Sequence, residues 1–150
     1  MDVYHEYGMV PFQHRKDLDI TLQILKEKYP AFAQTADSYM QSETAHECNM
    51  FIMKKEIYKN YCAWLFDILF EAEKRIDSIW YSVEEYRVMG YLAERLCGIY
   101  YEWLKTQPGI RAGELPKTLF KETAPKAVLE PVYPAGVPIV LSANDKFSPY

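Results

Sequence analysis

The feature that most constrains the fold is an apolar repeat of helical period between Ile57 and Ile76. Hydrophobic residues recur at steps of three and four, which places them on one face of an α-helix. They are Ile57, Tyr61, Trp64, Leu65, Ile68, Leu69, Ala72 and Ile76. Phe66 and Phe70 lie off this stripe, and a helix that is apolar on more than one side is normally covered on more than one side. We therefore expect a long helix whose second apolar side is covered either by this domain or by protein outside the chain.

Three further segments are predicted to be helical: Lys16 to Tyr29, Ala31 to Met40 and Glu84 to Leu104. Pro30 ends the first of them, because proline has no N–H to donate and disfavours helix in the residue before it. Ser82 and Glu85, three residues apart, match a capping box ahead of the last helix.

The run from Cys48 to Met53 is compatible with a short strand that carries Asn49 near its N-terminal end. Lys54-Lys55-Glu56 then changes the period from strand to helix. These patterns together predict a mainly α-helical fold with a few short strands.

The helix from Glu84 to Leu104 has two informative faces. Its expected core stripe is Tyr86, Met89, Ala93, Leu96, Tyr100 and Trp103. A neighbouring face carries Arg87, Gly90, Glu94, Gly98 and Tyr101. An interior glycine costs a helix roughly 0.8–1.0 kcal/mol relative to alanine, so two of them around Glu94 predict a close approach by another backbone or by a ligand. Two interpretations stay open: tight helix packing with Glu94 paired elsewhere, or a face that contacts substrate.

Composition and charge narrow the function classes. The 150 residues suit one domain, and 49% hydrophobic with 25% charged residues is typical of a folded, soluble protein. A net charge of −4 argues against nucleic acid as the main partner. The chain shows no signal peptide and no apolar run of the roughly 20 residues that a transmembrane helix needs.

The three cysteines, Cys48, Cys62 and Cys97, lack the spacing of metal ligands. Each lies in an apolar pattern, which predicts buried, reduced thiols in a cytoplasmic protein. We expect no metal site in this chain. Aromatic residues make up 15% of the sequence, and we expect them to serve a core or an interdomain contact rather than stacking on sugars.

The composition changes after Lys105. Residues 106–136 are rich in proline and glycine, which predicts a linker or an extended arm. Val137 to Leu141 then predicts a fresh β-strand, so residues 137–150 are expected to be the truncated start of a second domain.

Catalytic residues do not stand out by spacing alone. The sequence has no Ser-His-Asp or Cys-His arrangement, no glycine-rich phosphate loop and no zinc spacing. Residue chemistry therefore predicts only a helix-rich domain with a polar cleft between Asn49 and the face that carries Arg87 and Glu94.

Several motifs, in order along the chain, resemble a known family. They are Tyr4-x-x-Tyr7 with His14 and Asp17-Leu18-Asp19, Ile24 to Pro30, Asn49 to Glu56, Tyr61 to Leu69 and Arg87-x-x-Gly90-Tyr91-x-x-Glu94-Arg95-Leu96. Residues 3 to 104 resemble the downstream half of domain of unknown function 4422, a bacterial family of capsular and exopolysaccharide biosynthesis proteins regarded as glycosyltransferase-like. The resemblance implies that residues 1–105 are the helical, C-terminal and acceptor-side part of an α/β (GT-A-like) nucleotide-sugar transferase. The family's upstream half has no counterpart here.

The end of the chain carries a second resemblance. Val137 to Tyr150 is similar to the first strand and loop of glycosyltransferase family 8, and Asn144, Asp145 and Phe147 fall on the positions that contact the nucleotide base in that family. That family's metal-binding Asp-x-Asp motif lies beyond the end of this chain.

These resemblances imply a fragment of a cytoplasmic transferase, with the inner face of the membrane as an alternative location. Glu94 and Arg87 are the expected catalytic residues, Asn49 and His14 the expected substrate ligands, and Asn144, Asp145 and Phe147 the expected nucleotide contacts. The expected partners in the intact protein are a nucleotide-sugar donor, a glycan acceptor, free or lipid-linked, and the missing transferase segments. The chain itself is expected to hold no cofactor, and the intact protein can carry Mn or Mg. The competing hypothesis is a non-catalytic helical module that docks through the side of Phe66 and Phe70.

Overall fold

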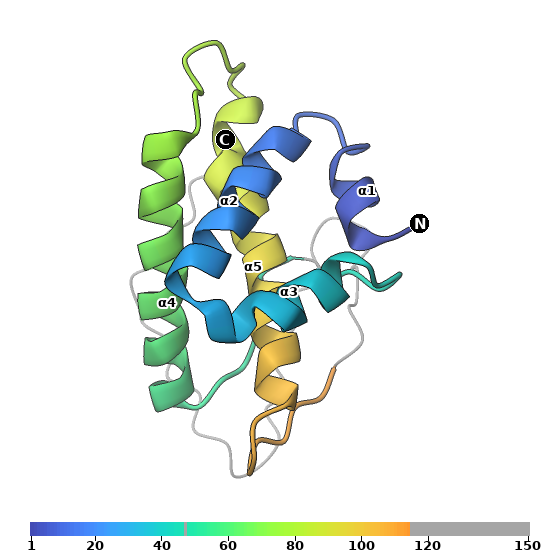
Figure 1. Ribbon diagram of the computed structural model, residues 1–150, viewed down its shortest axis with the longest axis vertical. Coiled ribbons are helices and arrows are strands. Elements are labelled where there is room, and N and C mark those ends of the chain that lie inside the picture. The colour runs from blue at the N-terminus through green and yellow to red at the C-terminus, as the bar shows by residue number, and fades with distance from the viewer. Residues whose placement is uncertain (47, 115–150) are drawn as a thin grey trace, which may run out of the picture. The chain divides into compact units, whose positions relative to one another are not determined.

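The computed structural model describes residues 1–46 and 48–114, and these residues form a helical domain (Figure 1). Its elements are α1 (Val3–Tyr7), α2 (Arg15–Lys28), η1 (Pro30–Phe32), α3 (Ala33–Met40), α4 (Lys55–Arg75), η2 (Glu85–Arg87) and α5 (Val88–Lys105), where η1 and η2 are short 3-10 helices. The mainly α-helical fold is thus confirmed. Residues 115–136 of the Pro-rich linker and the whole of the strand expected at 137–150 lie outside the described residues.

The ends of the helices follow from local sequence. Tyr29 ends α2 with its backbone N–H bonded to the carbonyl of Leu25, and Pro30 starts η1. The capping box at the start of η2 is formed, because Ser82 N–H donates to Glu85 Oε2 at 2.7 Å and Glu85 N–H donates to Ser82 Oγ at 3.2 Å.

The core lies among α2, α3, α4 and α5. Helix α2 packs against α4 and α5, and α3 packs against α5 (Figure 1). One end of the core is an aromatic cluster centred on Phe32, whose ring centroid lies 4.3 Å from that of Trp103 and 5.0 Å from that of Trp64. Much of the aromatic content therefore serves the core, as predicted.

Helix α4 buries the predicted stripe from Tyr61 to Ala72 but leaves its second apolar side uncovered by the described residues. Tyr61, Trp64 and Ile68 are buried, whereas Phe66 is 48% exposed and Phe70 is 60% exposed. The two phenylalanine rings stack on each other, with centroids 5.7 Å apart. Within the described residues, this domain therefore does not wrap the second side of α4.

The predicted strand at Cys48 to Met53 is wrong. Cys48 and Asn49 have φ angles of 77° and 43°, so the chain turns there instead of extending. Ile52 is 92% exposed, and no strand occurs in residues 1–46 and 48–114 for this segment to pair with. The prediction of three buried thiols is also wrong, because Cys48 is exposed and Cys62 and Cys97 are half-buried.

The predicted core stripe of the last helix is rotated from the observed one. Tyr86 lies in η2 and is 67% exposed, while Val88, Leu92 and Ile99 are buried on α5. Leu96 and Tyr100 are buried as predicted. The reason is the starting point of the helix: α5 begins at Val88, so residues before it do not continue its period.

Candidate functional site

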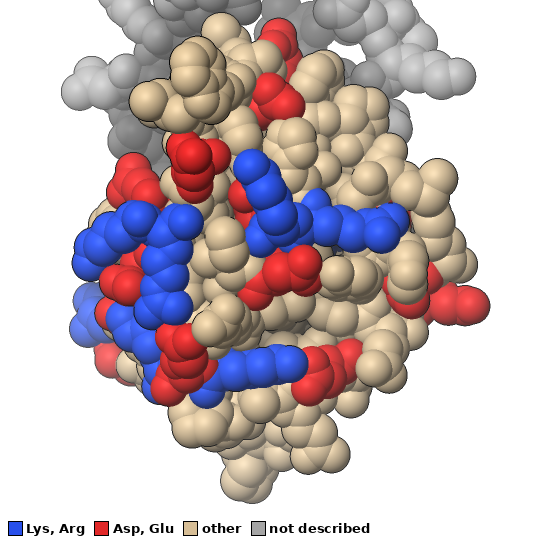
Figure 2. All heavy atoms as spheres, turned by 45° about the horizontal axis from the view of Figure 1, so that its top comes forward, with Lys and Arg blue, Asp and Glu red and all other residues tan. Residues whose placement is uncertain are grey.

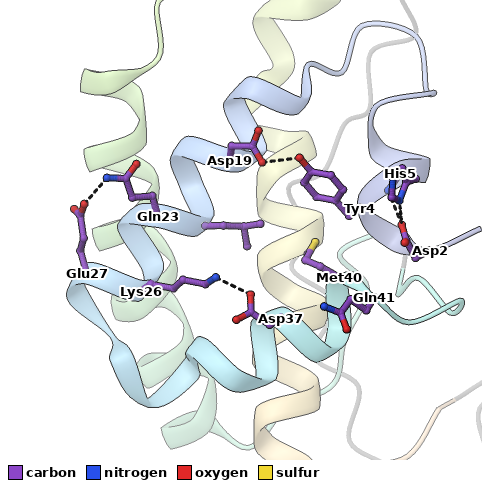
Figure 3. Close-up of a pocket in the computed structure, with 11 residues that line it drawn as sticks. Asp2, Tyr4, His5, Asp19, Gln23, Lys26, Glu27, Asp37, Met40 and Gln41 are labelled. Atoms are coloured by element: carbon purple, nitrogen blue, oxygen red, sulfur yellow. Dashed lines mark hydrogen bonds and ion pairs between the residues drawn. The ribbon is translucent and has the colours of Figure 1, made fainter.

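A polar groove of about 780 Å³ lies among α1, α2 and α3 (Figure 3). Side chains of Tyr4 and His5 line it from α1, and those of Asp37, Met40 and Gln41 from α3 and its end. The outward side of α2 supplies Asp19, Leu22, Gln23, Lys26 and Glu27, which recur at helical spacing. Asp2 completes the lining.

Two side-chain contacts cross the groove and hold its walls together. Tyr4 Oη donates to Asp19 Oδ1 at 2.9 Å and joins α1 to α2. Lys26 Nζ donates to Asp37 Oδ1 at 2.6 Å and joins α2 to α3 (Figure 3). Asp19 and Asp37 each keep a second carboxylate oxygen, and the amide of Gln41 has no side-chain partner among the described residues. These groups are the hydrogen-bonding capacity that the groove offers a ligand.

The groove is acidic. Four carboxylates, Asp2, Asp19, Glu27 and Asp37, face one lysine, Lys26. The backbone N–H and ring of His5 hold the pKa of Asp2 below its usual value. Hydrogen bonds from Arg75 and Gln23 do the same for the pKa of Glu27. A negatively charged lining favours a neutral ligand with hydroxyl donors over a negatively charged diphosphate.

Charges of both signs alternate over the neighbouring surface (Figure 2). Arg75 at the end of α4 illustrates this, because it bonds Glu27 at 2.8 Å and Glu71 at 2.9 Å. On the face that Figure 2 shows, basic and acidic side chains are therefore intermixed.

His14, an expected substrate ligand, lies in a separate polar cluster at the start of α2. Its Nε2 is 2.7 Å from Glu85 Oε1, and its ring centroid is 4.9 Å from that of Tyr81. The hydroxyl of Tyr81 lies 2.8 and 3.0 Å from the two oxygens of Asp17, a fully buried carboxylate. Burial raises the pKa of Asp17, and the bond from Tyr81 opposes that rise. This cluster ties the start of α2 to the segment between α4 and α5.

Arg87 and Glu94 form no hydrogen bond or ion pair with each other in the part of the chain that the structure describes. Arg87 precedes α5 and is exposed, with its guanidinium carbon 5.7 Å from the centre of the Tyr91 ring. Glu94 is half-buried and has no hydrogen bond or ion pair within residues 1–46 and 48–114. Its carboxylate is thus available for a partner, as an acceptor-hydroxyl ligand requires, and its role stays a prediction.

The two glycines around Glu94 have different surroundings. A Cβ at Gly98 would overlap the phenol ring of Tyr39, so this glycine permits a close approach by α3. A Cβ at Gly90 would meet nothing within 4 Å. The packing interpretation therefore holds for Gly98, and Gly90 leaves open space one turn before Glu94.

Asn49, the remaining expected ligand among the described residues, lies in the exposed turn before α4. Among the described residues no hydrogen bond or ion pair joins it to Arg87, Glu94 or His14, so direct bonds there do not assemble the predicted polar cleft. The expected nucleotide contacts Asn144, Asp145 and Phe147 lie outside the described residues.

Sequence reasoning missed two sets of polar residues. The groove residues Asp19, Gln23 and Lys26 follow a helical spacing that is also typical of any solvated helix face. Arg95 is 4% exposed, with Nη2 4.0 Å from Glu6 Oε1 and with Nε and Nη1 lacking hydrogen-bond partners among the described residues. Its burial could have been inferred from its position at helical spacing between the apolar residues Leu92 and Ile99, which are also buried.

In the described ranges, no group of three His, Cys, Asp or Glu side chains is placed to hold a metal ion. None of the helices that the structure describes has the length and hydropathy to cross a membrane.

The fold and the groove thus define a small helical domain with an acidic surface groove. Residues 1–106 match the family model described as domain of unknown function (DUF4422), and the chain belongs to that family. No curated protein matches the chain.

A solved structure extends this family assignment. The chain is similar to WbbM, a bifunctional glycosyltransferase solved in its apo form, with 32% sequence identity and a TM-score of 0.67. The match covers 69% of this chain and 18% of the WbbM chain. The chain thus resembles one helical part of a much longer transferase.

Proposed function

We propose that this chain is the helical, acceptor-side part of a glycosyltransferase that moves a sugar from a nucleotide-sugar donor to a glycan acceptor. The observation that carries the proposal is the similarity to a bifunctional glycosyltransferase at 32% identity over 69% of the chain. Synthesis of capsular polysaccharide, exopolysaccharide or lipopolysaccharide at the inner side of a cell membrane is the setting that we propose for it.

The polar groove fits the acceptor better than the donor. Neutral sugar hydroxyls donate to carboxylates, and the spare oxygens of Asp19 and Asp37 accept such bonds. A nucleotide diphosphate is itself negatively charged. It would be repelled by the four carboxylates of the groove and attracted by only one lysine. The donor and any Mn or Mg ion that accompanies it are therefore assigned to parts of the transferase outside this groove.

Glu94 and Arg87 remain the proposed chemical groups. Transfer needs a base or hydrogen-bond acceptor at the attacking hydroxyl and a positive charge near the leaving diphosphate. Glu94 supplies a half-buried carboxylate with no ion-pair partner among the described residues, and Arg87 supplies an exposed guanidinium with no carboxylate partner there. Asn49 and His14 are proposed as sugar-hydroxyl ligands.

Steady-state kinetics of the intact transferase tests these roles. Glu94→Gln and Arg87→Met are expected to lower kcat by about 10²-fold or more, the scale of a general base or a charge stabiliser, with an unchanged circular-dichroism spectrum. Asp37→Asn is expected to raise the KM for the acceptor about tenfold and leave the KM for the nucleotide sugar unchanged. Glu43→Gln, which removes an exposed carboxylate outside the groove lining, is the control. Unchanged turnover in both Glu94→Gln and Arg87→Met would remove these residues from the mechanism.

A second candidate function is a non-catalytic helical module, which the uncovered side of α4 at Phe66 and Phe70 favours. It requires that the intact protein bind no nucleotide sugar. Calorimetry of the intact protein with UDP-sugars separates the two candidates, because binding supports the transferase and its absence supports the module.

A further inference from the structure

Arg95 on α5 is a buried cation that contacts α1. Only 4% of its surface is exposed, and a buried charge is costly unless an opposite charge or an aromatic ring lies beside it. Nη2 of Arg95 lies 4.0 Å from Oε1 of Glu6, and its guanidinium carbon lies 5.7 Å from the centre of the Tyr7 ring. Tyr7 is fully buried. Both neighbours belong to α1, so this one side chain joins α5 to α1.

Arg95 also lies beside α3. The ring of Tyr39 lies against Gly98, which follows Arg95 by three residues and is therefore its neighbour on the surface of α5. Burial raises the pKa of Tyr39, and the N–H of His46 and the positive charge of Arg95 oppose that rise, in keeping with a guanidinium close to the phenol. Helices α1 and α3 pack against each other. Arg95 therefore lies where α1, α3 and α5 meet.

Helices α1 and α3 form two of the three walls of the polar groove (Figure 3). Helix α1 has five residues, too few to be stable in isolation, so its place depends on contacts with the rest of the domain. The N–H of Val3 donates to the carbonyl of Ser42 at 2.9 Å. The bond from Tyr4 to Asp19 is exposed in the groove, whereas Arg95 acts on α1 from the interior.

We propose that Arg95 is a positioning residue for the polar groove: its guanidinium holds α1 in place through Glu6 and Tyr7, and thereby fixes one wall of the groove. Arg95 is not among the residues that line the groove, so it acts on a ligand only through α1. A guanidinium suits this task because it attracts a carboxylate and also lies favourably over an aromatic ring. The inference rests on the acceptor role proposed for the groove.

Hydrogen exchange of the full chain, followed by NMR, tests whether Arg95 holds α1. The N–H groups of Val3 and Glu6 are hydrogen-bonded at 2.9 and 3.0 Å, and they exchange when α1 detaches. In Arg95→Met, exchange at these two amides is expected to be at least about tenfold faster than in the wild type, because the attraction between α5 and α1 is lost.

Ile68→Val on α4 is the matched control, since Ile68 is fully buried and the change removes one core carbon. It is expected to lower the overall stability and to leave the exchange of Val3 and Glu6 unchanged, because the contacts of Ile68 persist while α1 detaches. If Arg95 only contributed to the core, Arg95→Met would behave in the same way as this control.

Glu6→Gln changes the partner on α1 and leaves the buried residue in place. The side chain of Glu6 is 30% exposed, so the substitution does not disturb the core. Exchange at Val3 is expected to become about two- to fivefold faster in the wild-type background and less than about twofold faster in Arg95→Met, where the attraction is already lost. A Val3 amide that Glu6→Gln leaves unchanged would overturn the ion pair, even if Arg95→Met does not fold.

Binding of a neutral hexose oligosaccharide to the full chain tests the effect on the groove. The affinity scales with the fraction of molecules in which the groove is intact. Arg95→Met is therefore expected to weaken binding about three- to tenfold and Ile68→Val to leave it unchanged. Arg95→Lys is expected to weaken it less than Arg95→Met does, because lysine keeps the positive charge without the planar guanidinium.

Unchanged exchange at Val3 and Glu6 in Arg95→Met would overturn the proposal. Faster exchange without weaker oligosaccharide binding would overturn it as well, since the place of α1 would then not affect the groove. A wild-type chain that binds no oligosaccharide would instead contradict the acceptor role of the groove, and hydrogen exchange would still decide whether Arg95 holds α1.

Discussion

Gly98 on α5 is a position where one missing methyl group decides how two helices meet. The ring of Tyr39 from α3 lies against its Cα, and Tyr39 is 3% exposed. The hydroxyl of Tyr39 also accepts the backbone N–H of His46 at 2.9 Å, so the ring is held from two sides. The ring therefore has little freedom to move away from a larger residue at position 98.

Gly98→Ala is expected to destabilise the domain by about 1–3 kcal/mol, because the added Cβ overlaps a buried ring. Gly90→Ala on the same helix is expected to stabilise it by up to about 1 kcal/mol, because the new methyl group meets open space and alanine favours the helix. Urea denaturation of the two variants measures both changes. Equal effects of the same sign would contradict the different surroundings of the two glycines.

Asp17 gives a prediction about pH. Burial raises its pKa in the folded state, so the folded chain binds this proton more tightly than the unfolded chain does. The stability that comes from the protonated carboxyl is complete below the unfolded pKa of about 3.9, and it is lost as the pH rises through the folded pKa.

Asp17→Asn removes this titration and keeps an oxygen that accepts the Tyr81 hydroxyl. The free energy of unfolding of the variant, relative to wild type, is therefore expected to increase between about pH 4 and pH 7, by about 1.4 kcal/mol for each unit by which the pKa is raised. Thermal or urea unfolding across that range measures it. A difference that does not change with pH would show that burial of Asp17 has no effect on its protonation.

These two residues show what a sequence can and cannot reveal at this scale. Gly98 was predicted to permit a close approach because glycine is unfavourable inside a helix, and its neighbour Tyr39 confirms it. Asp17 was noted in the sequence only as part of the Asp17-Leu18-Asp19 motif, because its bonding partner Tyr81 lies 64 positions away along the chain. The buried Arg95 escaped notice for a similar reason, since its neighbours Glu6 and Tyr7 belong to α1.

At the scale of helices, the capping box before η2 connects local sequence to the wider fold. Glu85 accepts from Ser82 and also contacts His14 at the start of α2. The Ser82 N–H and then His14 hold the pKa of Glu85 below its usual value. The Glu85 carboxylate therefore caps the turn before η2 and also joins that turn to the start of α2.

Ser82→Ala is expected to destabilise the domain by about 1 kcal/mol, the usual effect of losing a helix N-cap. Ser38→Ala is the control, because Ser38 is exposed within α3 and its change is expected to stay within about 0.5 kcal/mol. Denaturant midpoints of the two variants give the comparison. A Ser82→Ala variant as stable as the control would mean that the capping box contributes nothing.

Most helices were predictable because their signals are local. The apolar period of α2 and α4, Pro30 and the Ser82–Glu85 pair fixed boundaries to within a few residues. The strand at Cys48 to Met53 was not realised, because β-branched and apolar residues favour a strand only where another strand pairs with them. The stripe of α5 was rotated because Tyr86 precedes the helix, and periodicity alone does not mark where the first turn begins.

At the scale of the whole domain, the polar groove exists only because three helices meet. Asp19, Lys26 and Asp37 are ordinary exposed residues on their own helices, and the bonds that join them cross from α1 to α2 and from α2 to α3. Their convergence depends on the packing of those helices, which the sequence pattern does not give. The same argument explains why Arg87, Glu94, Asn49 and His14 could be proposed from motifs but not arranged around one point.

The most direct test of the account is an NMR titration of the isotope-labelled full chain with a neutral hexose oligosaccharide, and in parallel with a UDP-hexose. The oligosaccharide is expected to shift the backbone amides of Tyr4, Asp19, Lys26 and Asp37, and Asp37→Ala is expected to weaken that binding about tenfold. The UDP-hexose is expected to leave the amides of these groove residues unchanged. Oligosaccharide shifts that are absent, or that fall on α4 instead of the groove, would contradict an acceptor-side role.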